Sequence, residues 1–175
     1  TARLSLEERV KAFWQLGELI RNLDSDEKGE IFQRANNQNS WFTEVSMESS
    51  LAGLSKLLNK QKLEDWLSSY QFPVFTQPRK VGILMAGNIP GVGFHDLMCV
   101  LISGHIAVPK LSSADSYFSN WLIQQLLKVE PRFKNYIQIE EMLKGMDAYI
   151  ATGSDNSARY FNYYFGKYPS VIRAN

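Results

Sequence analysis

Apolar residues in the first part of the chain recur with the period of an α-helix. Between positions 6 and 20 the spacing is three or four residues, which places these side chains on one helical face. They are Leu6, Val10, Phe13, Gly17 and Ile20. Ser5 and Glu8 just before and within this stretch form the capping-box pattern that begins a helix. Similar patterns predict a helix that starts near Asp24 and ends in the polar run 36–40, and two more over residues 45–58 and 63–70.

From Arg79 onward the pattern changes to short, unbroken apolar runs. Residues 81–86 (VGILMA) form one that is typical of a strand buried on both faces. Further strands are predicted at residues 106–108, 136–139, 148–151 and 171–173, with helices at 92–103, 117–129 and 156–166. Strands that alternate with helices indicate βαβ units and a parallel sheet. The sequence therefore predicts an α/β fold, with a helical N-terminal segment over residues 1–78 and a Rossmann-like parallel sheet over residues 79–175.

Composition and charge exclude several classes of protein. The chain has 175 residues with 19 basic and 18 acidic side chains, and this net charge of +1 argues against a nucleic-acid partner. Its single cysteine cannot form an intramolecular disulfide or a cysteine-based zinc site, and with only two histidines we expect no metal. The longest apolar stretch, residues 97–102, is far shorter than the roughly 20 residues of a membrane span. We therefore expect no membrane span and a cytoplasmic location.

Ligands of an open parallel sheet bind at the carboxyl ends of its strands, which directs attention to three turns. The first, residues 86–93 (AGNIPGVG), places Asn88 among glycines at the end of a strand. A side-chain amide in this position can donate a hydrogen bond to a developing oxyanion. The alternative is that Asn88 and the glycines only shape the turn.

The second and third turns carry residues suited to phosphate and ribose. Lys110 lies just past a strand end, where its cation can meet ribose hydroxyls or a phosphate. The alternative is a solvent-facing lysine beside a helix cap formed by Ser112, Ser113 or Asp115. Residues 152–156 (TGSDN) are small and precede a helix, which is typical of a pyrophosphate cradle but also of simple capping.

The single cysteine, Cys99, lies four residues after His95 and therefore on the same helical face. A Cys–His pair can activate a nucleophile. The surrounding apolar run 97–102 instead favours a buried, inert thiol. Asp96 beside His95 adds nothing to this prediction, since neighbouring residues of a helix face different directions.

Four stretches of the sequence occur in an order that is specific to one family. They are residues 85–96 (MAGNIPGVGFHD), 110–113 (KLSS), 151–156 (ATGSDN) and 163–169 (YYFGKYP). Together they resemble the acyl-CoA reductase family, which includes long-chain fatty acyl-CoA reductases and belongs to the aldehyde dehydrogenase superfamily. The resemblance covers residues 41–175 and implies an aldehyde dehydrogenase-type cofactor domain. It also implies NADPH-dependent reduction of a fatty acyl-CoA, or of an acyl-protein, to an aldehyde through a cysteine thioester.

The same resemblance implies the roles of individual residues. Asn88 matches the superfamily asparagine that helps to form the oxyanion hole, and Lys110 matches the lysine that contacts the adenosine ribose or its 2′-phosphate. Ser113 stands where many NAD-preferring relatives carry a ribose-binding glutamate, and a neutral side chain there favours NADP(H) because it does not repel the 2′-phosphate. The turn beside the cofactor, in which Ser154 is the expected phosphate contact, is matched by Thr152, Gly153 and Ser154. The implied partners are the acyl substrate, further copies in a homo-oligomer, or other subunits of a fatty-acid reductase complex.

One departure from the superfamily concerns the catalytic cysteine and the general-base glutamate. Both lie downstream of the Thr-Gly-Ser turn in that superfamily, and residues 155–175 contain no cysteine. Cys99 precedes the turn, so the resemblance does not make it the nucleophile. We therefore expect a truncated cofactor domain, the N-terminal portion of a longer enzyme, that is inactive by itself. The alternative is a non-catalytic nucleotide-binding or protein-interaction domain of the same fold.

Overall fold

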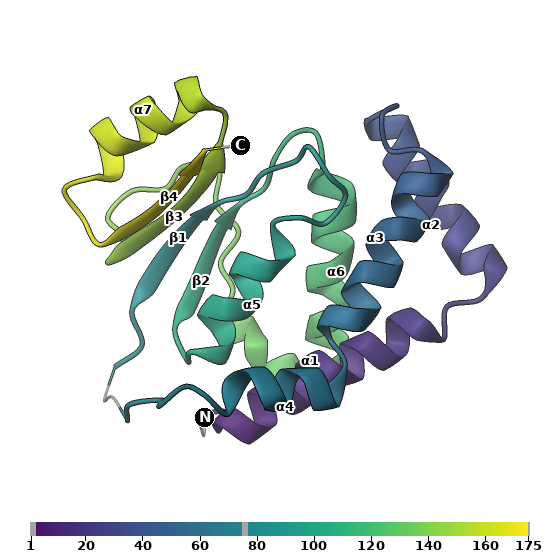
Figure 1. Ribbon diagram of the computed structural model, residues 1–175, viewed down its shortest axis with the longest axis horizontal. Coiled ribbons are helices and arrows are strands. Elements are labelled where there is room, and N and C mark those ends of the chain that lie inside the picture. Colours follow the sequence, from purple (N-terminus) through teal and green to yellow (C-terminus); the bar gives the residue numbers. More distant parts are fainter. Residues whose placement is uncertain (1–2, 75–76, 175) are drawn as a thin grey trace.

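The computed structural model of the protein describes residues 3–74 and 77–174 and shows an α/β architecture (Figure 1). Four parallel strands form one sheet in the order β2-β1-β3-β4. The strands are β1 (Lys80–Leu84), β2 (Ile106–Lys110), β3 (Ala148–Gly153) and β4 (Ser170–Ala174). The helices are α1 (Leu6–Arg21), α2 (Ser25–Gln38), α3 (Glu44–Leu57), α4 (Lys60–Leu67), α5 (Phe94–Ile102), α6 (Ser116–Val129), the short 3-10 helix η1 (Pro131–Asn135) and α7 (Asp155–Phe165). The predicted fold class, a parallel sheet preceded by helices, is confirmed.

The helical N-terminal segment begins as its sequence predicts. Ser5 and Glu8 form a reciprocal capping box, in which Ser5 Oγ accepts from the Glu8 N–H at 3.1 Å. α2 continues to Gln38, past the start of the polar run that was predicted to be a loop. The polar side chains of that run have partners that support the helix end, since Asn36 Nδ2 donates to the Phe42 carbonyl at 3.1 Å and Gln38 Oε1 accepts from the Tyr117 N–H at 2.9 Å.

The prediction of a strand at residues 136–139 is wrong in extent. Ile137 forms a single parallel bridge with Ala107 of β2. The Ala107 N–H donates to the Tyr136 carbonyl at 2.8 Å, and the Gln138 N–H donates to the Ala107 carbonyl at 2.9 Å. The Glu140 N–H also donates to the Pro109 carbonyl at 3.0 Å, but Pro109 has no N–H with which to return a hydrogen bond, so the pairing with β2 does not continue as a full strand.

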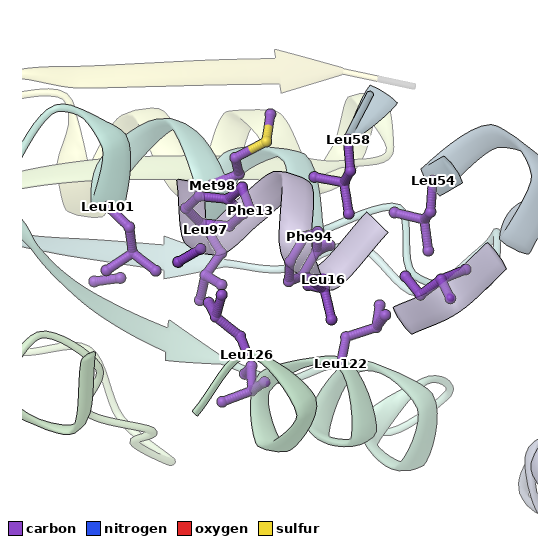
Figure 2. Packing of buried hydrophobic residues seen from close by; sticks show 14 of the residues in the cluster. Phe13, Leu16, Leu54, Leu58, Phe94, Leu97, Met98, Leu101, Leu122 and Leu126 are labelled. Carbon is purple, nitrogen blue, oxygen red and sulfur yellow. The ribbon is translucent and has the colours of Figure 1, made fainter. Parts of the chain in front are cut away.

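One hydrophobic core joins the helical segment to the sheet and its helices. Phe13 of α1 is fully buried, with its ring centroid 6.0 Å from that of Phe94 and 5.8 Å from that of Phe133. Figure 2 shows α1 side chains packed against α5, with leucines of α6 pointing into the same cluster. The labelled residues include Phe13, Leu16, Leu54, Leu58, Phe94, Leu97, Met98, Leu101, Leu122 and Leu126. The proposed boundary between residues 78 and 79 stays a prediction, but residues on both sides of it share this core.

The two faces of the sheet are covered by different helices. α5 packs on β1 and β2, whereas α7 lies beside β3 and β4 (Figure 1). On the α7 side the Phe165 ring stacks on Tyr149 of β3 at a centroid distance of 4.3 Å. None of the helices in the described part of the chain is both long and apolar enough to cross a membrane.

Candidate functional site

Asn88 lies in the turn that leaves the carboxyl end of β1. Its side chain is exposed and forms no hydrogen bond with any residue that the structure describes. The turn itself is tightly packed: a Cβ on Gly87 would collide with the Ser112 side chain, and one on Gly91, whose φ is +71°, would lie 2.9 Å from Phe118 Cε1. These glycines therefore shape the turn, while the Asn88 amide remains available to a ligand.

Lys110 ends β2, and Ser113 follows it in the loop that leads to α6. Lys110 is half-buried, and its ammonium group has no ion-pair partner among residues 3–74 and 77–174. Ser113 is exposed, and within the same residues its hydroxyl has no hydrogen-bond partner either. Ser112 Oγ accepts from the Ala114 N–H at 3.2 Å, inside the loop, and does not cap α6. An uncommitted cation and a neutral hydroxyl therefore lie at the carboxyl end of β2.

The third predicted turn is shorter in the structure than in the sequence-based prediction. Thr152 and Gly153 are the last residues of β3, because their pairing with Arg173 and Ala174 of β4 extends the strand. Ser154 alone forms the connection, and its Oγ caps α7 by accepting from the Ser157 N–H at 3.3 Å. Ser154 is therefore a helix cap, which is one of the two interpretations of this turn. A phosphate contact at the same helix start stays a prediction.

A network that sequence reasoning missed connects β4, β3 and α5. Asp96, in the first turn of α5, is only 7% exposed, and its Oδ2 accepts a hydrogen bond from Arg173 Nη2. The same guanidinium group donates to Thr152 Oγ1 at 2.9 Å. An aspartate at the start of one helix and an arginine at the end of a strand could have suggested this pair, since both belong to the carboxyl edge of the sheet. The Thr152 hydroxyl therefore already accepts a hydrogen bond from Arg173, whereas the side chains of Asn88 and Lys110 have no polar partner among the described residues.

His95 joins this network, so the prediction that its adjacency to Asp96 has no consequence is wrong. Asp96 uses one oxygen for Arg173 and turns the other, Oδ1, to within 3.8 Å of His95 Nδ1. The Asp96 carboxylate raises the pKa of His95 to about 10, the Cys99 thiol adds to the effect, and partial burial opposes it. His95 is therefore cationic at neutral pH.

Cys99 contacts His95 as the four-residue spacing predicted. Its Sγ lies 3.8 Å from His95 Nε2 and 3.9 Å from Nδ1. The thiol is half-buried, not fully buried as the apolar run suggested, because it borders a shallow hollow between α5 and the first residues of β3 and β4. Cys99 is thus on the α5 face of the sheet, one helical turn beyond His95.

Replacement of Asp96 by asparagine is expected to lower the pKa of His95 by about 1 to 3, the usual effect of losing a nearby opposite charge. The folded-state pKa of about 10 lies above the ordinary 6.5, so His95 stabilises the fold below pH 6.5 and this contribution disappears as the pH rises through about 10. NMR titration of the imidazole measures the change. His105 is the internal control, since burial lowers its pKa and Asp96 is not among the causes. A His95 that stays fully cationic at pH 9 in the variant would show that Asp96 is not responsible.

An apolar groove of about 430 Å³ runs beside the Asn88 turn, between that turn and α3. Ile89 and Val92 line one side, and Leu54 and Leu57 of α3 line the other. Polar side chains also reach the groove, namely His95 and the α3 serines Ser46, Ser49 and Ser50. Ile89 is 53% exposed and Val92 is 38% exposed, so the groove wall on the turn side is open to solvent. The carboxyl edge of the sheet therefore combines uncommitted polar groups with an apolar groove.

A scan against models of protein families finds no match to this chain, and neither does a search of curated proteins. Solved structures do match it in fold. A benzaldehyde dehydrogenase from Corynebacterium glutamicum, described as NAD-dependent, has a TM-score of 0.73 at 12% identity, with 96% of this chain and 41% of that chain covered. An NADP-dependent glyceraldehyde-3-phosphate dehydrogenase from Bacillus halodurans, complexed with NADP, has a TM-score of 0.70 at 13% identity, with 98% and 40% covered.

A third structure is the glyceraldehyde-3-phosphate dehydrogenase GapN from Methanocaldococcus jannaschii, also complexed with NADP. Its TM-score is 0.68 at 12% identity, and the match covers 98% of this chain and 42% of that one. The chain therefore has the fold found in part of these dehydrogenases, over almost its whole length. It spans about two fifths of the length of each.

Proposed function

We propose that this chain is the cofactor-binding part of an oxidoreductase of the aldehyde dehydrogenase superfamily, which uses NADPH to reduce a fatty acyl-CoA to an aldehyde. One observation carries the proposal. The uncommitted side chains of Asn88, Lys110 and Ser113 lie at the carboxyl ends of the neighbouring strands β1 and β2. An open parallel sheet binds dinucleotides at this edge. The fold match to nicotinamide-dependent dehydrogenases supports the same assignment.

The donor set at this edge suits the phosphates of NADPH. Lys110 offers a cation that no described carboxylate neutralises, and Ser113 offers a neutral hydroxyl. Backbone N–H groups at the start of α7, next to Ser154, are suited to a pyrophosphate. In this proposal these groups hold the nucleotide, and NADPH when bound supplies the hydride.

In this proposal Asn88 and the groove beside it bind the acyl substrate. The carbonyl oxygen of a thioester gains negative charge during reduction, and a preoriented amide N–H stabilises that charge. The apolar part of the groove, formed by Leu54, Leu57, Ile89 and Val92, suits an acyl chain, since each buried CH₂ group contributes about 0.8 kcal/mol. We assign Cys99 no step and place the nucleophile and the general base outside residues 1–175.

Replacement of Ser113 by glutamate is expected to weaken NADPH binding by about 5- to 30-fold, which corresponds to roughly 1–2 kcal/mol of repulsion between two largely exposed charged groups. NADH lacks the 2′-phosphate, and a glutamate at this position can accept hydrogen bonds from its ribose hydroxyls, so the affinity for NADH should not fall. Fluorescence titration of the 175-residue chain with each nucleotide measures both constants. Ser113→Gln has nearly the same size without the charge and is the matched control.

Two results would contradict parts of this proposal. Tighter binding of NADH than of NADPH by the unmodified chain would overturn the choice of cofactor. A chain that binds neither nucleotide, although it is folded, would instead support a protein-interaction domain of the same fold.

A further inference from the structure

Asp115 is a buried carboxylate that the proposed function does not use. It is 1% exposed at the start of α6, where its Oδ2 accepts the Gly91 N–H at 2.7 Å and the Ser119 hydroxyl at 3.1 Å. Its other oxygen, Oδ1, is buried without a hydrogen-bond partner among the described residues. Burying an acid with one unsatisfied oxygen costs stability.

The hydrogen bond from the Gly91 N–H links Asp115 to the turn that carries Asn88. Among the described residues, only Asp115 supplies a side-chain hydrogen bond to the turn 86–93. Gly91 has a φ of +71° and its Cα lies against Phe118 and Leu122 of α6, so the turn rests on the helix at this residue. Asp115 therefore ties the turn that carries Asn88 to the rigid first turn of α6, although its side chain does not cap that helix.

We infer that Asp115 is a positioning residue whose carboxylate, through the Gly91 N–H, holds the Asn88 amide where an oxyanion can receive its hydrogen bond. This inference rests on the proposed role of Asn88 and extends it to a residue that would not touch substrate. An ionised acceptor forms a stronger hydrogen bond than a neutral one. Protonation or neutralisation of Asp115 therefore loosens the turn without removing Asn88.

The surroundings of Asp115 make its ionisation sensitive to pH. Burial raises its pKa to about 6, and hydrogen bonds from Gly91 and Ser119 oppose this effect. The turn 86–93 contains no titratable side chain, and the end of α2 brings Gln38 and the following Asn39, both uncharged, to the start of α6. Tyr117 of α6 and Arg34 of α2 are titratable groups at this end of the helix, where the Arg34 guanidinium carbon lies 6.0 Å from the centroid of the Tyr117 ring.

The sign of the effect on stability follows from the raised pKa. The unfolded chain loses the Asp115 proton near the ordinary 3.8, whereas the folded chain keeps it until about pH 6. The contribution of Asp115 to the free energy of unfolding is therefore largest below pH 3.8 and falls as the pH rises through about 6. At neutral pH the ionised Asp115 carboxylate holds the turn through the Gly91 N–H, but its ionisation lowers the free energy of unfolding of the whole chain.

NMR of the 175-residue chain between pH 4.5 and 8 tests the inference without any turnover. The backbone amide of Gly91 and the side-chain amide of Asn88 are expected to titrate together with a midpoint near 6. In Asp115→Asn both signals should become independent of pH, and exchange of the Gly91 amide should accelerate about 5- to 10-fold. Ser119→Ala is the matched control, because it removes the other donor: the turn should still titrate, with a higher midpoint.

Titration of the two histidines should not be mistaken for that of Asp115. The pKa of His95 lies near 10, outside the range. His105 accepts the Arg79 N–H just before β1, at the opposite edge of the sheet from Asn88. If Asp115→Asn does not fold, the titration of the unmodified chain alone decides the matter.

A second measurement uses a form of the protein that carries a nucleophile and turns over acyl-CoA. There, Asp115→Asn is expected to lower turnover about 5- to 10-fold at neutral pH and to abolish the decline of activity below about pH 6. A Gly91 signal that titrates while Asn88 does not would overturn the positioning role and leave the proposed function intact. Joint titration of Gly91 and Asn88 in a chain that binds no nucleotide would support the positioning of the turn and refute the proposed function.

Discussion

Replacement of Asn88 by alanine is expected to lower the turnover of acyl-CoA by about 10²- to 10³-fold, the effect of removing one oxyanion donor. The measurement requires a form of the protein that carries a nucleophile. The reason is geometric: the Asn88 amide is exposed, has no hydrogen-bond partner among the described residues, and follows the strand end beside the apolar groove. Its loss should lower the rate constant for reduction and leave the affinity for NADPH unchanged.

A stability measurement separates this catalytic effect from misfolding. Asn88 is exposed and its side chain forms no hydrogen bond with any described residue, so its replacement should change the free energy of unfolding by less than about 0.5 kcal/mol. Asn37→Ala, in which an exposed amide of α2 is removed far along the chain, is the matched control and should leave turnover unchanged. If Asn88→Ala retains full turnover, the oxyanion role is wrong.

Replacement of Phe13 by alanine is expected to lower the free energy of unfolding by about 3–5 kcal/mol, the usual cost of removing a buried aromatic ring. Phe13 is 0% exposed, and its ring contacts Phe94 of α5 and Phe133 of η1, so the cavity would lie between the helical segment and the sheet layer. A small domain is stable by only about 5–15 kcal/mol in total, so this loss is severe. Urea denaturation monitored by circular dichroism measures it.

The same experiment tests whether residues 1–78 unfold separately from residues 79–175. Because one core spans both parts, we expect a single transition in the unmodified chain and in Phe13→Ala. Val45→Ala removes an apolar side chain that is 80% exposed and should cost less than about 0.5 kcal/mol. Two resolved transitions would show instead that the helical segment is an independent unit.

Local patterns predicted most of the secondary structure because they report short-range interactions. The capping box of Ser5 and Glu8 and the apolar run of β1 each depend on residues a few positions apart. The errors occur where a distant partner decides the conformation. Thr152 and Gly153 extend β3 because β4 pairs with them. Ile137 forms only one bridge because its partner strand continues into Pro109, which has no N–H to donate.

The candidate site also combines residues that local sequence predicts with contacts that only distant partners decide. Asn88, Lys110 and Ser113 were predicted from strand ends, since a parallel sheet brings these ends to one edge. The structure adds that all three side chains lack a polar partner among the described residues, whereas Thr152 is hydrogen-bonded to Arg173 and Ser154 caps α7. The sequence left both alternatives open for each turn, because the partner of a side chain can lie on a distant element.

By itself, the sequence determined the α/β class, the order of helices and strands, and the three turns at which chemistry could occur, because periodicity, caps and breakers are local. Only the tertiary structure decided which distant polar groups meet. Asp96 and Arg173 are 77 positions apart, and Asp115 and Gly91 are 24 apart, yet each pair is in contact. Such pairs form because the parallel sheet brings one end of every strand to the same edge, where a buried carboxylate must find its partner across elements.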